Sequence, residues 1–434
     1  MHQGKIFHNA KWIIGCKIIQ ALIQMIIGML TARYLGPANY GLVNYAASLT
    51  AFVLPFMQLG LQSTLVQEYI LAPEKNGEIL GTAMVMTLVS GTLSMLGVVG
   101  FSLVANWGET TTIVVCVLYS ITLLCQSLEL IQYWFQARML SKYSSLAMLG
   151  AYIVVSAYKV FLLVTGKSVY WFALSHAVEY GASGVLMFIL QCRLGTQKLR
   201  FSLQTAGSML SRSKYYILSA MMVTIFQNTD HVMLKLMCGD VENGYYTAAV
   251  TCVCLANFVY NGIIDAARPA FLESRRESVA AFEGNITRLY SVIIWLTVAQ
   301  CIVFEVLAEP IVLFLYAQNY RPAISVLRVL VWLLPFSYIG SVRNVWILGM
   351  ERYSILWKIN LSGVVANVFL NAVMIPLWGA CGAALASVLT QFVANLVTGF
   401  LMPPLRRNNQ LMLRGLDPRN LVDLLRRFLL NRVH

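Results

Sequence analysis

The chain has 434 residues, of which 59% are hydrophobic and only 11% are charged. Soluble globular domains carry roughly 25% charged residues, so this composition excludes a chain whose apolar residues all lie inside one water-soluble core. The apolar runs are long and continuous, whereas the strands of a membrane barrel alternate in segments of about ten residues, so we expect membrane-spanning helices.

Twelve apolar segments along the chain are long enough to cross a bilayer. They cover residues 12–32, 43–66, 79–105, 111–136, 145–166, 169–191, 215–236, 244–267, 289–308, 324–348, 354–377 and 379–402. The predicted fold is an all-α membrane protein of about twelve transmembrane helices in two six-helix lobes. We expect an N-lobe at 1–192, a cytoplasmic connecting segment at 193–214, a C-lobe at 215–402 and a basic cytoplasmic tail at 403–434.

Lysine and arginine predict the orientation, because they accumulate in cytoplasmic loops. The expected outer loops contain only Arg33, Lys167 and Arg321, whereas most other basic loop residues lie on the side of the termini. Both termini are therefore predicted to be cytoplasmic. Beyond Pro418, leucines and one phenylalanine repeat at helical spacing among arginines, which predicts a basic amphipathic helix on the anionic inner leaflet.

Two glycine pairs suggest an internal repeat. Gly36 and Gly41 separate the first two spans, and Gly239 and Gly244 separate the seventh and eighth at the same offset of 203 residues. A six-plus-six repeat is typical of transporters that bind substrate between their halves and use alternating access.

Polar residues within the predicted spans are the candidates for function, because ionisable groups at membrane depth are costly. Stripes of lysine, arginine and side-chain amides favour an anionic passenger such as a diphosphate, with amides suited to sugar hydroxyls. The predicted substrate-binding residues are Lys17, Gln20, Gln24, Lys159, Arg268, Asn257, Asn261 and Arg343. The alternative is that these groups form hydrogen bonds between neighbouring helices. A cation near a span end, such as Arg343, could also extend to the membrane–water interface.

Four acidic residues in the spans are candidates for coupling transport to a proton or sodium ion. They are Asp230, Asp265, Glu129 and Glu179. They could equally neutralise nearby bases, as the spacing of Asp265 and Arg268 suggests. Gly166-Lys167-Ser168 resembles the end of a phosphate loop but lacks the earlier glycine, so neither nucleotide nor any other cofactor is expected. The nine cysteines show no metal-ligand spacing, and no metal site is expected.

Several stretches resemble the polysaccharide-transporter branch of the multidrug/oligosaccharidyl-lipid/polysaccharide (MOP) flippase superfamily, particularly O-antigen flippases of the Wzx type. They are residues 32–41 (ARYLGPANYG), 133–136 (YWFQ), 230–246, 371–376 and 379–384. The resemblance implies a two-lobed fold in the bacterial plasma membrane. It also implies translocation of an undecaprenyl-diphosphate-linked oligosaccharide to the outer leaflet, with Lys17 and Arg268 meeting the diphosphate. Membrane lipid and other polysaccharide-assembly membrane proteins would be the partners.

Three other functions compete with this interpretation. A drug or cation exporter of related fold would carry cations, which suit Lys17 and Lys159 poorly. A membrane polymerase or ligase usually has a large external loop, and every expected external loop here is short. A flippase for the peptidoglycan precursor is the remaining alternative.

Overall fold

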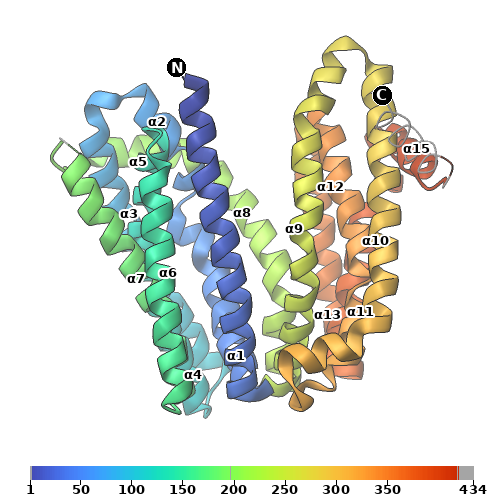
Figure 1. Cartoon of the computed structure of the whole chain (residues 1–434), viewed down its shortest axis with the longest axis horizontal. Coiled ribbons are helices and arrows are strands. Elements are labelled where there is room, and N and C mark those ends of the chain that lie inside the picture. The colour runs from blue at the N-terminus through green and yellow to red at the C-terminus, as the bar shows by residue number, and fades with distance from the viewer. Residues whose placement is uncertain (1, 196, 418, 420–434) are drawn as a thin grey trace. The chain divides into compact units, whose positions relative to one another are not determined.

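The computed structural model describes residues 2–195, 197–417 and 419 (Figure 1). The description does not include the side chains of residues 2–11, 13, 14, 219, 255–259, 265, 266, 269, 270, 272, 277 and 353. Throughout the described residues the regular secondary structure is helical, which confirms the predicted all-α class.

The chain forms two compact units, Met1–Leu236 and Met237–His434. Unit 1 contains α1 (His2–Gln58), α2 (Leu65–Leu71), α3 (Asn76–Ala105), α4 (Thr110–Gln126), α5 (Ile131–Ala137), α6 (Ser141–Val164), α7 (Val169–Leu194) and nearly all of α8 (Leu203–Cys238). Unit 2 contains α9 (Asp240–Glu277), α10 (Val279–Tyr316), α11 (Ala323–Leu330), α12 (Leu333–Gly349), α13 (Leu356–Phe392), α14 (Thr398–Leu401) and α15 (Arg406–Gly415). Helix α8, which is predicted to begin the second lobe, is thus grouped with the first six spans. The boundary between the two transport lobes, at the connecting segment 193–214, stays a prediction.

Eight helical segments of the described chain are long and apolar enough to cross a membrane. Two of them, Gly15–Gln58 and Leu356–Leu401, have 44 and 46 residues, whereas a single crossing needs about 20. Each is broken by a glycine with positive φ, Gly36 (φ 71°) and Gly379 (φ 54°), so each covers most of two predicted spans. The predicted spans 215–236 and 244–267 lie in α8 and α9, outside these eight segments. The number of crossings and the side of the termini stay predictions.

The two units contain similar backbone turns at corresponding positions. Gly36 has φ 71° and ψ 173°, and Gly239 has φ 93° and ψ −179°, a conformation that glycine adopts without steric cost. Met139 and Glu351, which follow the predicted fourth and tenth spans, both have a φ near +55° (54° and 56°). These matched turns agree with the internal repeat proposed from the glycine spacing.

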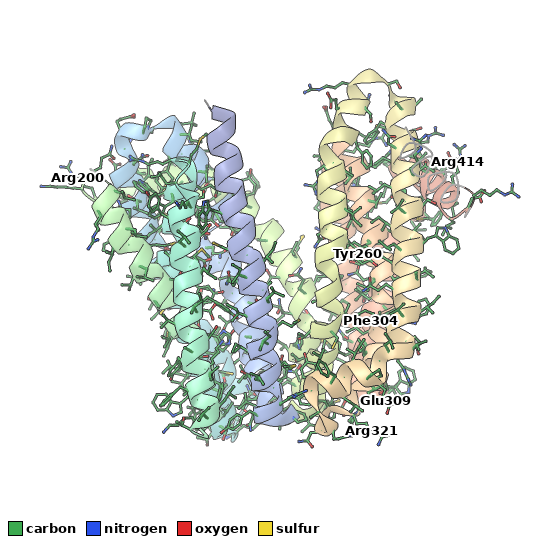
Figure 2. All side chains as sticks on the ribbon, viewed as in Figure 1. Arg200, Tyr260, Phe304, Glu309, Arg321 and Arg414 are labelled. Atoms are coloured by element: carbon green, nitrogen blue, oxygen red, sulfur yellow. The ribbon has the colours of Figure 1, made fainter. Side chains whose placement is uncertain are left out.

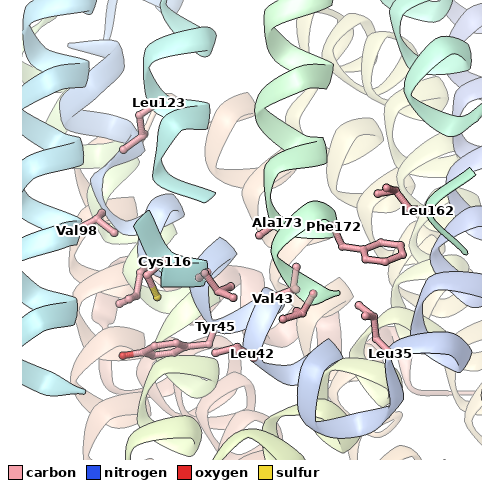
Figure 3. Close-up of a cluster of buried hydrophobic side chains, with 14 of the residues drawn as sticks. Leu35, Leu42, Val43, Tyr45, Val98, Cys116, Leu123, Leu162, Phe172 and Ala173 are labelled. Carbon is pink, nitrogen blue, oxygen red and sulfur yellow. The ribbon is translucent and has the colours of Figure 1, made fainter. Parts of the chain in front are cut away.

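One of two hydrophobic clusters of unit 1 lies where α1, α3, α4, α6 and α7 meet (Figure 3). Tyr45, Cys116 and Ala173 are fully buried there, and Phe172 packs beside them. Small residues at these contacts let helices approach closely, which is how membrane helices associate when lipid is as apolar as the side chains. This cluster therefore holds these five helices together.

The connecting segment after α7 lies along the first turns of α3. The side chain of Gln197 accepts a hydrogen bond from the amide of Gly77 (2.8 Å) and donates one to the carbonyl of Pro73 (2.9 Å). A β-carbon at Gly77 would stand only 2.4 Å from the Lys198 carbonyl oxygen, and one at Gly81 only 2.6 Å from that of Arg200. Glycine is thus required on α3 for this segment to pack.

Helix α15 was not predicted, and it packs on α10 and α12. Arg407 forms an ion pair with Glu283 of α10, and Tyr290 of α10 donates a hydrogen bond to Asn408 (2.9 Å). The basic amphipathic helix predicted beyond Pro418 lies outside the described residues.

Candidate functional site

Unit 1 contains a buried polar cluster between α4, η3 (Ser127–Leu130), α6 and α7. Lys159 of α6 and Glu179 of α7 form an ion pair with 3.9 Å between Nζ and Oε2, and their side chains are only 12% and 18% exposed. Glu129 of η3 accepts a hydrogen bond from Gln132 (3.3 Å) and interacts electrostatically with Glu179. The structure therefore brings together one predicted substrate-binding residue and two predicted ion-coupling residues.

Two aromatic side chains extend this cluster, and sequence analysis did not select them. His176 lies one turn before Glu179 on α7 and stacks on Tyr119 of α4, with 4.9 Å between ring centroids. Lys159 interacts electrostatically with His176. The signal for His176 was its spacing of three residues from Glu179 on one helical face. We call Tyr119, Glu129, Lys159, His176 and Glu179 the α6–α7 cluster.

The predicted stripe in α1 lies at the surface of unit 1. Lys17 and Gln24 are exposed and Gln20 is half-buried. The three residues are spaced at i, i+3 and i+7, so they share one side of the helix. A cation and two amides are thus displayed together on this helix.

Helix α9 displays a second part of the predicted set. Asn261 and Arg268 are both exposed and seven residues apart, which places them on one side of the helix. The side chains of Asn257 and Asp265 lie outside the described residues. Asp230, in α8 of unit 1, is buried.

Arg343 in α12 is buried to 3% exposure and therefore does not extend to the interface. Its guanidinium donates hydrogen bonds to the carbonyl oxygen of Ala394 (3.2 Å) and to Asn344 (3.5 Å). Ala394 belongs to a π-helical turn, η6 (Val393–Val397), a rare geometry that inserts one extra residue into a helix. These contacts give Arg343 a role in fixing that turn, and its role in substrate binding stays a prediction.

A second ion pair of unit 1 joins a buried lysine to a half-exposed glutamate. Lys235 of α8, 4% exposed, contacts Glu109 with 2.6 Å between Nζ and Oε2, and Thr112 donates to the same oxygen (2.7 Å). Tyr45 and Asn106 are hydrogen-bonded beside it (3.0 Å), and the ammonium stands 6.0 Å from the Tyr45 ring. Sequence analysis could not find this pair, because its members are 126 residues apart.

Among the described residues, histidine, cysteine and acidic side chains form no group of three or more that could hold a metal ion. The polar groups of both units are instead cations, carboxylates, amides and aromatic hydroxyls. Such groups can bind an anionic or hydroxylated molecule and can exchange protons.

Comparison with known proteins identifies the family. A family model described as "Polysaccharide biosynthesis protein" matches residues 6–275. The capsular polysaccharide biosynthesis protein CapF of Staphylococcus aureus is 21% identical over 402 residues, which cover 89% of this chain and 96% of that protein.

Solved structures show the same fold. The lipid II flippase MurJ in an inward closed conformation aligns with a TM-score of 0.71 at 14% identity, over 93% of this chain and 90% of that one. An inward-facing multidrug resistance MATE family transporter of the MOP superfamily aligns with a TM-score of 0.67 at 14% identity, over 90% and 95%. These likenesses confirm the predicted MOP-type fold.

The candidate membrane spans and the shared fold make this chain a multi-pass membrane protein with the fold of membrane transporters, as predicted. The chain belongs to the polysaccharide biosynthesis protein family, and its fold is that of a MOP superfamily transporter.

Proposed function

We propose that this protein flips an undecaprenyl-diphosphate-linked oligosaccharide, such as an O-antigen or other surface polysaccharide repeat unit. The molecule would pass from the cytoplasmic to the outer leaflet of a bacterial plasma membrane by alternating access. The family supports a role in polysaccharide biosynthesis, and the fold supports transport. The substrate and the membrane are inferred from the chemistry below.

The observation that carries the proposal is the display of cations and amides on membrane helices. Lys17, Gln20 and Gln24 share one side of α1, and Asn261 and Arg268 share one side of α9. A lysine or arginine facing lipid would be strongly unfavourable, so such stripes are stable where they face water and a ligand. Lysine and arginine suit the diphosphate, and the amides suit the hydroxyls of the sugar.

The α6–α7 cluster supports coupling to protons. Glu179 is paired with Lys159 and also interacts electrostatically with Glu129, so these three groups are electrically balanced when one of the two carboxyl groups carries a proton. Uptake and release of that proton would change the contacts between η3, α6 and α7. In this proposal the cluster senses the proton gradient, while the α1 and α9 stripes hold the passenger.

The test is substitution of Lys17 in a strain that lacks the native gene. Lys17→Ala should abolish surface polysaccharide and leave lipid-linked repeat units in the inner leaflet, whereas Lys17→Arg, which keeps the charge, should retain display. Arg200→Ala is the control, because it removes another exposed cation of unit 1 that lies outside the α1 stripe (Figure 2). Normal polysaccharide in Lys17→Ala cells with normal protein abundance would contradict the assigned role of this stripe.

A MATE-like exporter of drugs or cations is the second candidate, since the fold is shared with a MATE transporter. Efflux of a fluorescent cation from cells that express the protein distinguishes the two. The displayed basic residues predict no efflux, and proton-dependent efflux lost in Glu179→Gln would favour the exporter.

A further inference from the structure

Helix α15 lies where α10 enters its predicted membrane span, 289–308, and the proposed transport does not use it (Figure 1). The side chain of Tyr290 runs along the inner side of α15. Its hydroxyl donates a hydrogen bond to Asn408 near the start of α15 (2.9 Å). At the end of α15, a β-carbon added to Gly415 would stand 2.6 Å from the β-carbon of Tyr290. Both ends of α15 are therefore held at the level where the predicted span begins.

The exposed side of α15 is divided into an apolar edge and a basic edge. Successive residues of an α-helix are rotated by about 100°, which gives the position of each side chain around the axis. Leu413 and Leu416 lie along one edge, and their side chains are 50% and 43% exposed. Arg407 and Arg414 lie along the other edge, and Arg406 lies between the two. This division is typical of a helix that lies in a membrane interface.

Two contacts show which edge faces the membrane. Asn409 lies on the leucine edge, and its Oδ1 would be 3.1 Å from a β-carbon added to Gly399, which belongs to the predicted span 379–402. Arg407 lies on the basic edge and donates to Glu283 (2.9 Å), six residues before α10 enters its predicted span. The leucine edge therefore faces the hydrocarbon, and the basic edge faces the water.

The charge of the exposed side selects an anionic ligand. The charge of Arg407 is balanced by Glu283, whereas Arg406 and Arg414 are exposed at the membrane boundary. Arginine suits the phosphate of a lipid headgroup, because its planar guanidinium can donate two parallel hydrogen bonds.

Acidic residues do not cancel this charge. Among the described residues from 406 to 419 the one carboxylate side chain is that of Asp417, beside four arginines. With Glu283 included, the net charge is still +2. Asp417 accepts a hydrogen bond from the backbone amide of Arg419 (2.9 Å), and the side chain of Arg419 is itself exposed. The surface therefore attracts anionic lipids more strongly than zwitterionic ones.

We propose that α15 is an interfacial helix that binds an anionic phospholipid of the phosphatidylglycerol type. Leu413 and Leu416 enter the acyl region, while Arg406 and Arg414 contact the lipid phosphate. This helix is separate from the amphipathic helix predicted beyond Pro418. The inference does not depend on the molecule transported, because none of these residues belongs to the α1 or α9 stripe or to the α6–α7 cluster.

Matched charge variants test the lipid preference. One variant carries both Arg406→Gln and Arg414→Gln. The control is Arg321→Gln, which removes a 72% exposed cation at the opposite end of unit 2 from Arg414 (Figure 2). Each full-length protein is reconstituted into vesicles of equal parts phosphatidylethanolamine and phosphatidylglycerol and re-extracted in mild detergent. Native mass spectrometry then measures the bound lipids, and size-exclusion chromatography checks the fold.

We expect the wild type and Arg321→Gln to retain phosphatidylglycerol in preference to phosphatidylethanolamine. Each arginine near an anionic surface should raise this preference about fivefold, so the double variant should lose about 25-fold. An unchanged lipid ratio in the double variant would overturn the site. Displacement of phosphatidylglycerol by inorganic phosphate would show a site for free anions and overturn the assigned occupant.

A second measurement tests the apolar edge. Hydrogen exchange of the backbone amides of residues 406–416 is compared in vesicles of phosphatidylglycerol and of phosphatidylcholine. Exchange in the wild type should be slower in phosphatidylglycerol, and Leu413→Gln, which keeps both arginines, should lose this difference. The control Leu203→Gln alters a 79% exposed leucine of unit 1 and should behave as the wild type. Equal exchange of wild-type α15 in the two kinds of vesicle would refute its insertion.

Discussion

The ion pair between Lys159 and Glu179 offers a quantitative test of the α6–α7 cluster. At 3.9 Å, two unit charges attract each other by about 4 kcal/mol at an effective dielectric constant of ~20. Both side chains are more than four-fifths buried, so water screens them little. Lys159→Met keeps the apolar stem and leaves the carboxylate without its counter-charge, and we expect it to lower the free energy of unfolding by about 3 kcal/mol.

A double-mutant cycle separates the pair from its surroundings. Glu179→Gln alone should also cost about 3 kcal/mol, whereas the combined variant should cost only about 2, because neither charge is then left alone. The assay is reversible unfolding in mixed micelles for the four proteins. Additive losses, with a coupling energy under about 1 kcal/mol, would refute the argument that these charges stabilise each other. A stable double variant that no longer transports would show that the cluster acts in transport as well as in stability.

Two further predictions concern the edges of unit 1. Gly77→Ala should lower the free energy of unfolding by about 1–3 kcal/mol, because its β-carbon would lie 2.4 Å from the Lys198 carbonyl oxygen. Gly97→Ala in the same helix has open space around its β-carbon and should raise the free energy of unfolding by about 0.5–1 kcal/mol. Thermal unfolding of both variants checks this, and a stabilised Gly77→Ala would contradict the packing described. The lowered pKa of Glu109 means that its contribution to stability is present above its usual value near 4.5 and is lost as the pH falls through the lower folded value. The melting temperature of the wild type should thus fall more steeply below pH 4 than that of Glu109→Gln, and parallel curves would rule out this contribution.

Hydropathy was enough to predict the helices, because lipid demands about 20 apolar residues for each crossing. All twelve predicted segments are helical over most of their length, and the predicted break between the last two, at residue 378, lies next to the observed break at Gly379. The irregular features escaped prediction. The π-helical turn at Val393–Val397 and the short helix α15 have no marker in apolar periodicity, since both depend on neighbours distant in sequence.

The same limit applies to the polar residues. The cost of an ionisable group at membrane depth identified Lys159, Glu129 and Glu179 as candidates, but nothing in the local sequence shows that α6 faces α7 with 3.9 Å between two charges. Arg343 illustrates the opposite case. Its position near a span end allowed it to extend to the interface, yet the carbonyl of Ala394 offers a buried acceptor. The packing of α12 against η6 gives Arg343 this acceptor, and the local sequence around Arg343 does not show that packing.

The π-helical turn also determines which way the side chains of the following residues point. An extra residue turns the rest of a helix by about 100° relative to an uninterrupted α-helix. Thr398, directly after the turn, meets Ser362 of α13 with 2.9 Å between hydroxyl oxygens, and Gly399 lies against Asn409 of α15. Without the inserted residue Thr398 and Gly399 would face other neighbours, and the chain that follows them would reach α10 from a different direction. The packing of α15 therefore depends on the extra residue in the π-helical turn that precedes it. The hydrogen bond from Arg343 to Ala394 stabilises that turn.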